Sequence, residues 1–124
     1  MEHVVSILLT LAGFQLKHFI CDGPLQTLGM VQAKSYYGRP LGVLHAAIHG
    51  VGTLVVFLLA GTGSALLLAL ADFVIHYHID FAKENVVKKM GWTTSTGPFW
   101  WALSADQGLH QLTYLALVWF SLKP

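Results

Sequence analysis

Charge is what this sequence has least of. Only 10% of its 124 residues are Asp, Glu, Lys or Arg, whereas 55% are hydrophobic; soluble domains carry about 25% charged residues. A soluble chain of this length would need an unusually large interior to bury so much apolar surface, but a membrane protein leaves that surface to lipid. The net charge of +1, with no basic patch interleaved with aromatics, gives no indication of a nucleic-acid partner.

Cysteine is almost absent as well. Cys21 stands alone, which excludes an intramolecular disulfide and a zinc site built from cysteines; we expect it to pack as a small hydrophobe. No serine or cysteine lies in a nucleophile motif, which disfavours a soluble nucleophilic enzyme. The N-terminal "MEHVVSILLTLAGFQL" lacks a basic n-region and a small-residue cleavage site, so we expect a retained membrane helix and not a removed signal peptide.

Long apolar runs are what the chain has in place of charge. A transmembrane helix needs about 20 mostly apolar residues, and four stretches approach that length: 3–22, 41–60, 65–84 and 99–121. "DGP" ends the first, "GTGS" joins the second and third as an antiparallel hairpin, and 23–40 reads as a short interfacial helix followed by a loop. We therefore predict an all-α fold, with one transmembrane domain over 1–124 formed by a bundle of four transmembrane helices.

The distribution of lysine and arginine orients this bundle. Positive residues gather in the first and third connections, whereas the "GTGS" turn has none; they are Lys34 and Arg39 in the first, and Lys83, Lys88 and Lys89 in the third. Because Lys and Arg mark the cytoplasmic side, we predict cytoplasmic connections and two non-cytoplasmic termini. Membrane lipids are then direct partners, and the lipid-facing surface of four short helices favours a homo-oligomer or a larger membrane complex.

His and Asp pair four residues apart in every predicted span. The pairs are His18/Asp22, His45/His49, His76/Asp80 and Asp106/His110, and Asp72 extends the third to D-x3-H-x3-D. Residues four apart lie one turn apart on the same helix face. In the predicted topology all four pairs fall toward the cytoplasmic leaflet, with Asp106/His110 in the first turns of the fourth helix. The sequence therefore predicts one cluster inside the bundle.

A metal would compensate for the burial of these side chains. A charged group at the centre of a bilayer costs about 2.5–3.5 kcal/mol on insertion scales, and imidazoles and carboxylates bind zinc, iron or manganese directly. We predict a divalent metal, with zinc favoured and iron or manganese as alternatives. The predicted ligands, more than one zinc ion needs, are His18, Asp22, His45, His49, His76, Asp80, Asp106 and His110.

A metal-dependent hydrolase is the function that these residues favour, with a lipid-like or phosphate-containing substrate entering near the cytoplasmic leaflet. A catalytic metal keeps an open position for water and lowers the pKa of that water. Asp22 or Asp106 is then a candidate general base. Lys83 and Gln26 are candidates for stabilising negative charge, although Lys83 taken alone reads as a snorkelling residue.

Three alternatives stay open. The same His/Asp chain suits the transport of protons or of a divalent cation. A non-catalytic accessory subunit of a larger membrane complex, holding haem or a chlorophyll through a histidine, is the second alternative, although the clustered aspartates disfavour haem. A purely structural network of polar side chains between helices is the third.

Four short motifs, taken in order, resemble those of a known family. "HFICDGPLQ", "LHAAIHG", "HYHIDFAK" and "ADQGLHQL" are similar to the H-x3-D-x3-Q, L-H-x3-H, H-x3-D-x2-K and D-Q-x2-H segments of an uncharacterised family of small polytopic bacterial and phage inner-membrane proteins. The resemblance implies a multi-pass protein of the bacterial inner membrane, but no activity. A looser similarity is to membrane-bound metal-dependent hydrolases.

The family motifs fall on the predicted site. The positions that the resemblance carries over are His18, Asp22, Gln26, His45, His49, His76, Asp80, Lys83, Asp106, Gln107 and His110. One departure is the Gly23-Pro24 step, where other members have an aromatic or aliphatic residue after the aspartate. It bears on the placement of Gln26, because a proline interrupts helical phase.

Overall fold

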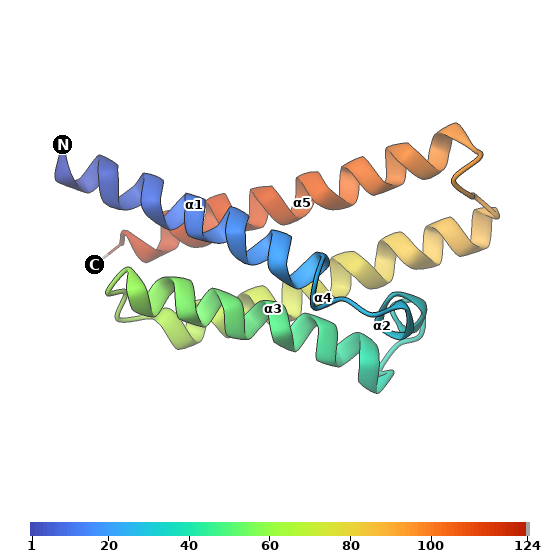
Figure 1. Cartoon of the computed structure of the whole chain (residues 1–124), viewed down its shortest axis with the longest axis horizontal. Helices are drawn as coiled ribbons and strands as arrows, with labels where there is room; N and C mark the ends of the chain where they lie inside the picture. The colour runs from blue at the N-terminus through green and yellow to red at the C-terminus, as the bar shows by residue number, and fades with distance from the viewer. Residues whose placement is uncertain (124) are drawn as a thin grey trace.

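The computed structural model describes residues 1–123, and every regular element in that range is a helix, which confirms the predicted all-α class. Five helices follow one another: α1 (Glu2–Asp22), α2 (Leu28–Ala33), α3 (Pro40–Leu59), α4 (Ala65–Met90) and α5 (Gly97–Ser121) (Figure 1). The four long helices correspond to the four apolar stretches of the sequence, and α2 is the short helix expected within 23–40.

Local sequence signals set where the helices begin and end. Pro40 begins α3 at a position where its missing N–H is not needed. Thr27 caps α2, since its hydroxyl accepts a hydrogen bond of 3.3 Å from the backbone N–H of Met30. Gly91 ends α4 in the left-handed conformation, with a φ of 65° that favours glycine.

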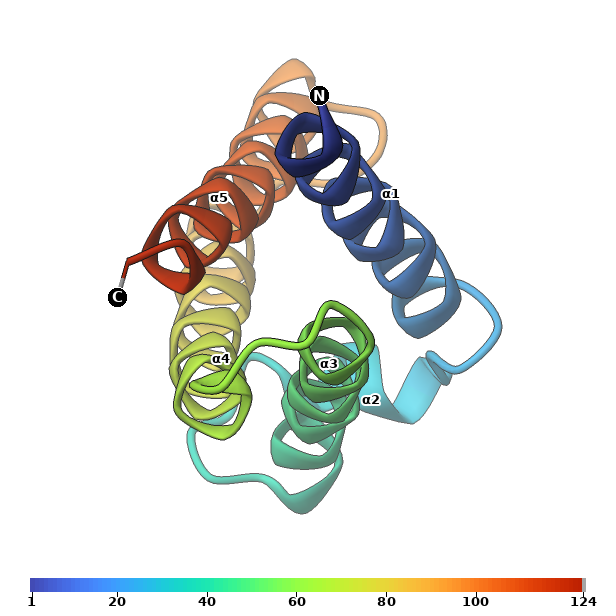
Figure 2. The same ribbon diagram turned by 90° about the vertical axis from the view of Figure 1, so that its left-hand side faces the viewer.

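The four long helices stand around a common interior. α1 packs against α3 and α5, and α4 packs against the same two helices from the opposite corner, as the end-on view shows (Figure 2). The start of α1, the end of α5 and the α3–α4 turn lie at one end of the molecule, here called the terminal end (Figure 1). The connections 23–39 and 91–96 lie toward the other, the loop end. The sequence predicted this grouping of termini and connections.

Three helices are long and apolar enough to cross a membrane, which is consistent with a membrane protein. They are α1, α3 and α4. α5 has 25 residues, which is sufficient length for a crossing, but it is not among these three. Its central turns carry Asp106, Gln107, His110 and Gln111, which lower its hydropathy.

α4 is longer than the sequence predicted. The apolar stretch suggested an end near residue 84, but the helix continues to Met90. Hydropathy indicates the length of a helix that lipid covers, whereas Glu84, Asn85, Lys88 and Lys89 are polar; glutamate and lysine are good helix formers. Lys88 and Lys89 in the last turn also favour the helix through its dipole. At about 1.5 Å per residue, α4 and α5 therefore extend beyond the loop ends of α1 and α3 (Figure 1).

Apolar side chains cover much of the outside, and polar side chains fill much of the interior. Leu9, Leu67 and Trp101 are 68%, 69% and 79% exposed, whereas His45, His49 and Thr53 have no exposed surface. A lipid solvent favours this inverted distribution. Among the described residues, the apolar core lies toward the terminal end of the bundle. It comprises Phe14, Phe57, Ala65, Leu68, Tyr114, Leu117 and Val118.

Candidate metal centre

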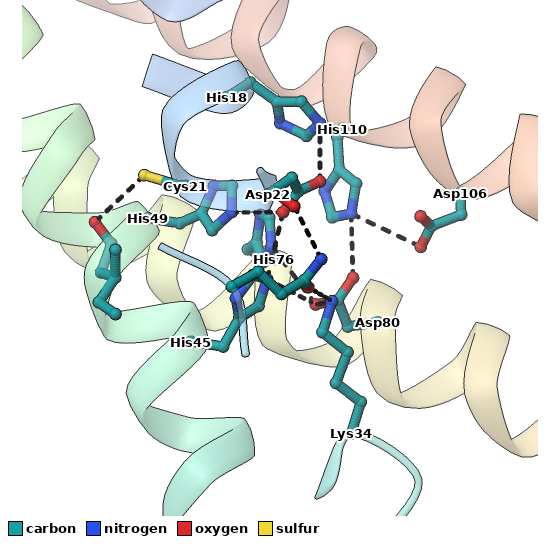
Figure 3. Close-up of polar contacts among 12 residues, drawn as sticks. His18, Cys21, Asp22, Lys34, His45, His49, His76, Asp80, Asp106 and His110 are labelled. Carbon is teal, nitrogen blue, oxygen red and sulfur yellow. Dashed lines mark hydrogen bonds and ion pairs between the residues drawn. The ribbon is translucent and has the colours of Figure 1, made fainter. Parts of the chain in front are cut away.

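The His/Asp pairs of all four long helices converge in the interior (Figure 3). α1 supplies His18 and Asp22 from its last turns, α3 supplies His45 and His49, α4 supplies His76 and Asp80, and α5 supplies Asp106 and His110. Seven of these eight side chains are buried, and Asp22 is partly exposed. The structure thus brings together the side chains that helical phase placed on inward faces. The α5 pair lies near the middle of that helix and not in its first turns, because α5 begins well beyond the loop end of α1.

One group of ligand atoms comes from three helices. Asp22, His45, His49 and His76 each offer a ligand atom within 4.8 Å of the others. Oδ1 of Asp22 lies 2.8 Å from Nε2 of His49 and 3.3 Å from Nε2 of His45. Three imidazoles and one carboxylate are a donor set that zinc and iron accept in four-coordinate or more open sites.

A second group adjoins the first and shares His76 with it. His76, Asp80 and His110 also offer ligand atoms within 4.8 Å of one another. The carboxylate of Asp80 places Oδ1 3.2 Å from Nε2 of His110 and Oδ2 3.4 Å from Nε2 of His76. The His76 ring stacks between its neighbours, with centroids 3.7 Å from His49 and 4.0 Å from His110. The two groups therefore admit one ion, or two adjacent ions of which His76 can hold only one, because a neutral imidazole has a single acceptor nitrogen.

Several imidazole nitrogens of this centre have no hydrogen-bond partner among residues 1–123. They are both nitrogens of His45, both nitrogens of His76 and Nδ1 of His49, all without solvent access. Nε2 of His45 and of His76 lie 3.3 to 3.4 Å from carboxylate oxygens of Asp22 and Asp80, within the range of an ion pair but without hydrogen-bond geometry. A buried polar atom left unpaired costs about 1–3 kcal/mol. A divalent metal would satisfy such nitrogens directly, and its charge would offset the neighbouring carboxylates. The donor set and its unpaired atoms thus fit a metal.

His18 and Asp106 lie beside the two ligand groups and belong to neither. Nε2 of His18 is 2.8 Å from Oε1 of Gln107 and 3.0 Å from Oδ2 of Asp22, and its Nδ1 is 2.7 Å from the hydroxyl of Tyr114. With both nitrogens engaged by protein atoms, His18 is built to orient Asp22. Asp106 accepts a hydrogen bond of 3.0 Å from the Gln107 amide and lies 3.5 Å from Nε2 of His110.

Lys34 enters the centre from the loop end, which sequence reasoning missed. Its ammonium forms an ion pair with Oδ2 of Asp80 at 2.9 Å and donates a hydrogen bond to Oε1 of Gln26 at 2.7 Å, and the residue is only 8% exposed. The sequence analysis counted Lys34 as one of the charges that orient the bundle. Helical phase gave no signal for it, since it follows α2 in a connection. Gln26 also reaches the site despite Pro24, with its amide donating to the backbone carbonyl of Asp22 at 2.9 Å.

Lys83 lies outside this set of contacts. Its ammonium forms an ion pair with the carboxylate of Glu84, the next residue on α4. Lys83 and Asp106 both line an open groove of about 610 Å³ between α4 and α5, whose other walls are almost all apolar. Cys21 is buried and packs near the carbonyl of Ile48, in the manner expected of a small hydrophobe.

The family model for a protein of unknown function, DUF3307, matches residues 8–123. The chain belongs to this family. The match spans all of the side chains that form the candidate centre, and it confirms the predicted membership of an uncharacterised family. Comparison with curated proteins and with solved structures finds no match. Evidence for the chemistry of this DUF3307 chain therefore comes from its own residues.

A second buried polar group adjoins the centre of this DUF3307 protein on its terminal side. The ammonium of Lys17 donates to Oδ2 of Asp72 at 2.9 Å and to the hydroxyl of Tyr114 at 3.1 Å. Thr53 donates to the same Asp72 oxygen at 2.5 Å. Asp72, which extended the sequence motif of α4, thus pairs with Lys17 and not with the metal-ligand groups. A lysine inside the first apolar run was the available signal for this pair.

Proposed function

We propose that this protein is a membrane-embedded, metal-dependent hydrolase acting on a lipid-like or phosphate-containing substrate. The observation that carries the proposal is the set of buried imidazole nitrogens without a partner, beside the carboxylates of Asp22 and Asp80. A polar network that served only to join helices would satisfy its own donors and acceptors, since each unpaired atom lowers stability. A metal site needs the opposite, namely ligand atoms left free for the ion.

Zinc is the metal that the donor set favours, with iron or manganese as alternatives. Imidazoles and carboxylates suit all three, and His76 joins two groups that together accept one or two ions. When bound, such a metal supplies Lewis acidity and lowers the pKa of a coordinated water. The protein's own contribution is to fix the ligands, as His18 does for Asp22.

Asp106 is the best-placed general base. It is buried next to His110 but lies outside both ligand groups, and its Oδ1 has no hydrogen-bond partner in residues 1–123. A carboxylate in that position can take a proton from water near the centre. Asp22, the other candidate base of the sequence analysis, belongs to a ligand group and is better suited to hold the metal.

The groove between α4 and α5 supports a lipid-like substrate. Apart from Lys83, Asp106 and His78, its lining is apolar, with Ile75, Ile79, Val86 and Leu109 among the walls. An acyl chain in this groove would lie along Asp106 and bring a polar headgroup toward the centre. Asp22, whose side chain is 23% exposed, gives a second approach from the loop end for a water-soluble group.

The membrane placement that completes the proposal has four crossings. α5 is the proposed fourth transmembrane helix, because its length matches the span requirement and it packs against both α1 and α4. With the positive connections cytoplasmic, both termini lie outside the cytoplasm, and the resemblance noted above favours the bacterial inner membrane.

Transport of protons or cations is less well supported by the interior. The polar side chains continue from the centre to Lys17 and Asp72, but an apolar core that includes Phe14, Phe57 and Leu68 lies beyond them toward the terminal end. A continuous path would have to cross this core. Haem is also disfavoured, because the stacked rings of His49, His76 and His110 have no space between them for a macrocycle.

Elemental analysis of the detergent-purified protein tests the proposal first. Near-stoichiometric zinc, iron or manganese is expected in the wild type and in His3→Ala, a control at an exposed histidine. His49→Ala and Asp80→Ala, each losing a ligand of one group, should lose metal while keeping the same elution volume in gel filtration. Folded wild-type protein without metal, even after incubation with each ion, would refute the metal centre.

The hydrolase assignment needs its own readout. Phosphate release from short-chain phosphatidic acid, a phosphate monoester, by the metal-loaded wild type is expected, with a loss in Asp106→Asn that leaves the metal content unchanged. Metal-loaded protein that hydrolyses no phosphate ester or carboxylate ester of a lipid would reduce the proposal to a metal-binding protein.

A further inference from the structure

Lys34 is held over the candidate metal centre by a strap, defined here as residues 27–39, which includes α2. Met30 and Ala33 of α2 are buried against the bundle, and α2 packs directly on α3. Gly42 permits this packing, because a Cβ at that position would lie only 3.3 Å from the carbonyl oxygen of Ala33. The base of the Lys34 side chain is therefore fixed by close backbone contact.

The second half of the strap is fastened along α4. Asn85 donates to the carbonyl of Ser35 at 3.1 Å, and the hydroxyl of Tyr77 accepts a hydrogen bond of 2.6 Å from the backbone N–H of Gly38. Lys88 donates to the hydroxyl of Tyr36 at 2.8 Å, a bond that lowers the pKa of that phenol below its ordinary value. These contacts describe a fixed support for Lys34 and not a mobile lid.

Lys34 and His110 approach different oxygens of the Asp80 carboxylate. The ammonium lies 2.9 Å from Oδ2, which is also 3.4 Å from Nε2 of His45 and of His76, while Nε2 of His110 lies 3.2 Å from Oδ1. An ammonium has three N–H donors, and within residues 1–123 it makes one hydrogen bond, to Gln26, beside its ion pair with Asp80. The ammonium therefore has donor capacity left for a ligand at the edge of the centre.

Charge balance indicates the kind of ligand. Asp22, Asp80 and Asp106 contribute three negative charges, Lys34 contributes one positive charge, and metal-bound histidines are neutral. A single divalent ion would bring this set to zero, whereas two ions would leave a net charge of about +2. Uncompensated charge in a membrane interior is costly, so a doubly occupied centre would attract an anion.

We propose that Lys34 binds the anionic group of the substrate, a phosphoryl group, at the metal centre. This inference rests on the proposed function and names the residue that recognises the substrate. Lysine is a common phosphate ligand that acts as a point charge. The sequence suggested Lys83 as the residue that stabilises negative charge. Lys83, however, forms an ion pair with Glu84, whereas Lys34 forms an ion pair with Asp80, a candidate metal ligand.

The binding of inorganic phosphate to metal-loaded protein tests this assignment by isothermal titration calorimetry. The variants are Lys34→Met, Lys34→Arg and the control Lys89→Met, at an exposed lysine outside the groove, with the metal content of each measured beforehand. In Lys34→Met the metal should stay and phosphate affinity should fall by about tenfold or more, as expected for the loss of a charged hydrogen bond. Lys34→Arg should restore part of the affinity, and Lys89→Met should bind like the wild type.

Two results would overturn the assignment. Unchanged phosphate affinity in metal-loaded Lys34→Met would show that the ammonium does not bind the anion. Loss of metal from that variant would show that Lys34 serves to hold Asp80. If Lys34→Met does not fold, Lys34→Gln takes its place, since glutamine keeps a donor toward Asp80 without the charge. A wild type without metal would refute the proposed function itself, which separates the two failures.

The source of the phosphoryl group is distinguished by competition. Short-chain phosphatidic acid that displaces phosphate from the wild type, and binds it more tightly, would identify a lipid headgroup; equal or weaker binding would identify free phosphate. Both results uphold the assignment of Lys34 if Lys34→Met weakens the better ligand.

Discussion

Lys17 and Asp72 form an ion pair inside the bundle, with 2.9 Å between Nζ and Oδ2 and side chains that are 4% and 1% exposed. Both residues come from apolar helices, α1 and α4, which do not pack directly against each other. The pair therefore joins opposite corners of the bundle through its centre. Lys17 precedes His18 directly, and Asp72 lies one helical turn before His76. The ion pair therefore fixes the axial position of α1 relative to α4, two helices that contribute to the candidate metal centre.

Removing Lys17 should destabilise the protein strongly. In Lys17→Met the carboxylate of Asp72 stays buried without its cation, a change that costs about 3–5 kcal/mol. The double variant Lys17→Met/Asp72→Asn should recover part of that loss, because no unpaired charge remains. Thermal unfolding in detergent measures the effect, with Lys89→Met, at an exposed lysine, as the control. A Lys17→Met midpoint equal to that of the control would contradict the importance of the pair.

A methyl group at Gly52 should disturb the same pair. A Cβ added there would lie 2.6 Å from Cγ of Lys17, which is too close for any carbon atom. Gly52→Ala must therefore displace the lysine side chain, and overpacking of this kind costs about 1–3 kcal/mol. Gly63→Ala is the matched control, since its Cβ would meet no atom within 4 Å. Equal unfolding midpoints for the two variants would show that Lys17 adjusts without loss.

Metal removal should lower the stability of the wild type. A ligand that binds only the folded state stabilises it by about 2.7 kcal/mol at a concentration of 100 times Kd. A chelator is therefore expected to lower the unfolding midpoint of metal-loaded wild type and of His3→Ala. His76→Ala, which removes the residue common to both ligand groups, should show no such change. A chelator effect of equal size in His76→Ala would place the metal elsewhere.

Metal affinity should fall as the pH falls. Imidazole nitrogens bind a metal only when they are unprotonated, so protons compete with the ion for the histidine ligands. The expected result is an apparent zinc affinity that decreases as the pH is lowered. Equilibrium dialysis at a series of pH values measures it. A zinc affinity that does not change between neutral pH and the onset of acid unfolding would indicate ligands other than histidine.

Helical phase predicted much of the candidate centre, because its residues lie on regular helices. Pairs four residues apart must share a helix face, and the cost of exposing them to lipid turns that face inward. This reasoning predicts that His45, His49 and His76 meet inside the bundle, and their ligand atoms do lie within 4.8 Å of one another. It could not predict that Asp72 lies outside the metal-ligand groups. Helical phase gives the face of the helix on which a residue lies, but not which residue of a neighbouring helix it contacts.

The all-α class, the apolar exterior and the inward faces of the four long helices follow from the amino-acid sequence alone, since they result from local periodicity and the cost of polar groups in lipid. Which polar groups meet depends on the tertiary structure. Lys34 reaches Asp80 because a strap folds across α3 and along α4, and Lys17 reaches Asp72 because Gly52 leaves room for its side chain. Such contacts depend on the axial positions of the helices relative to one another and on the path of the connection 23–39. Neither can be predicted from the periodicity of the sequence.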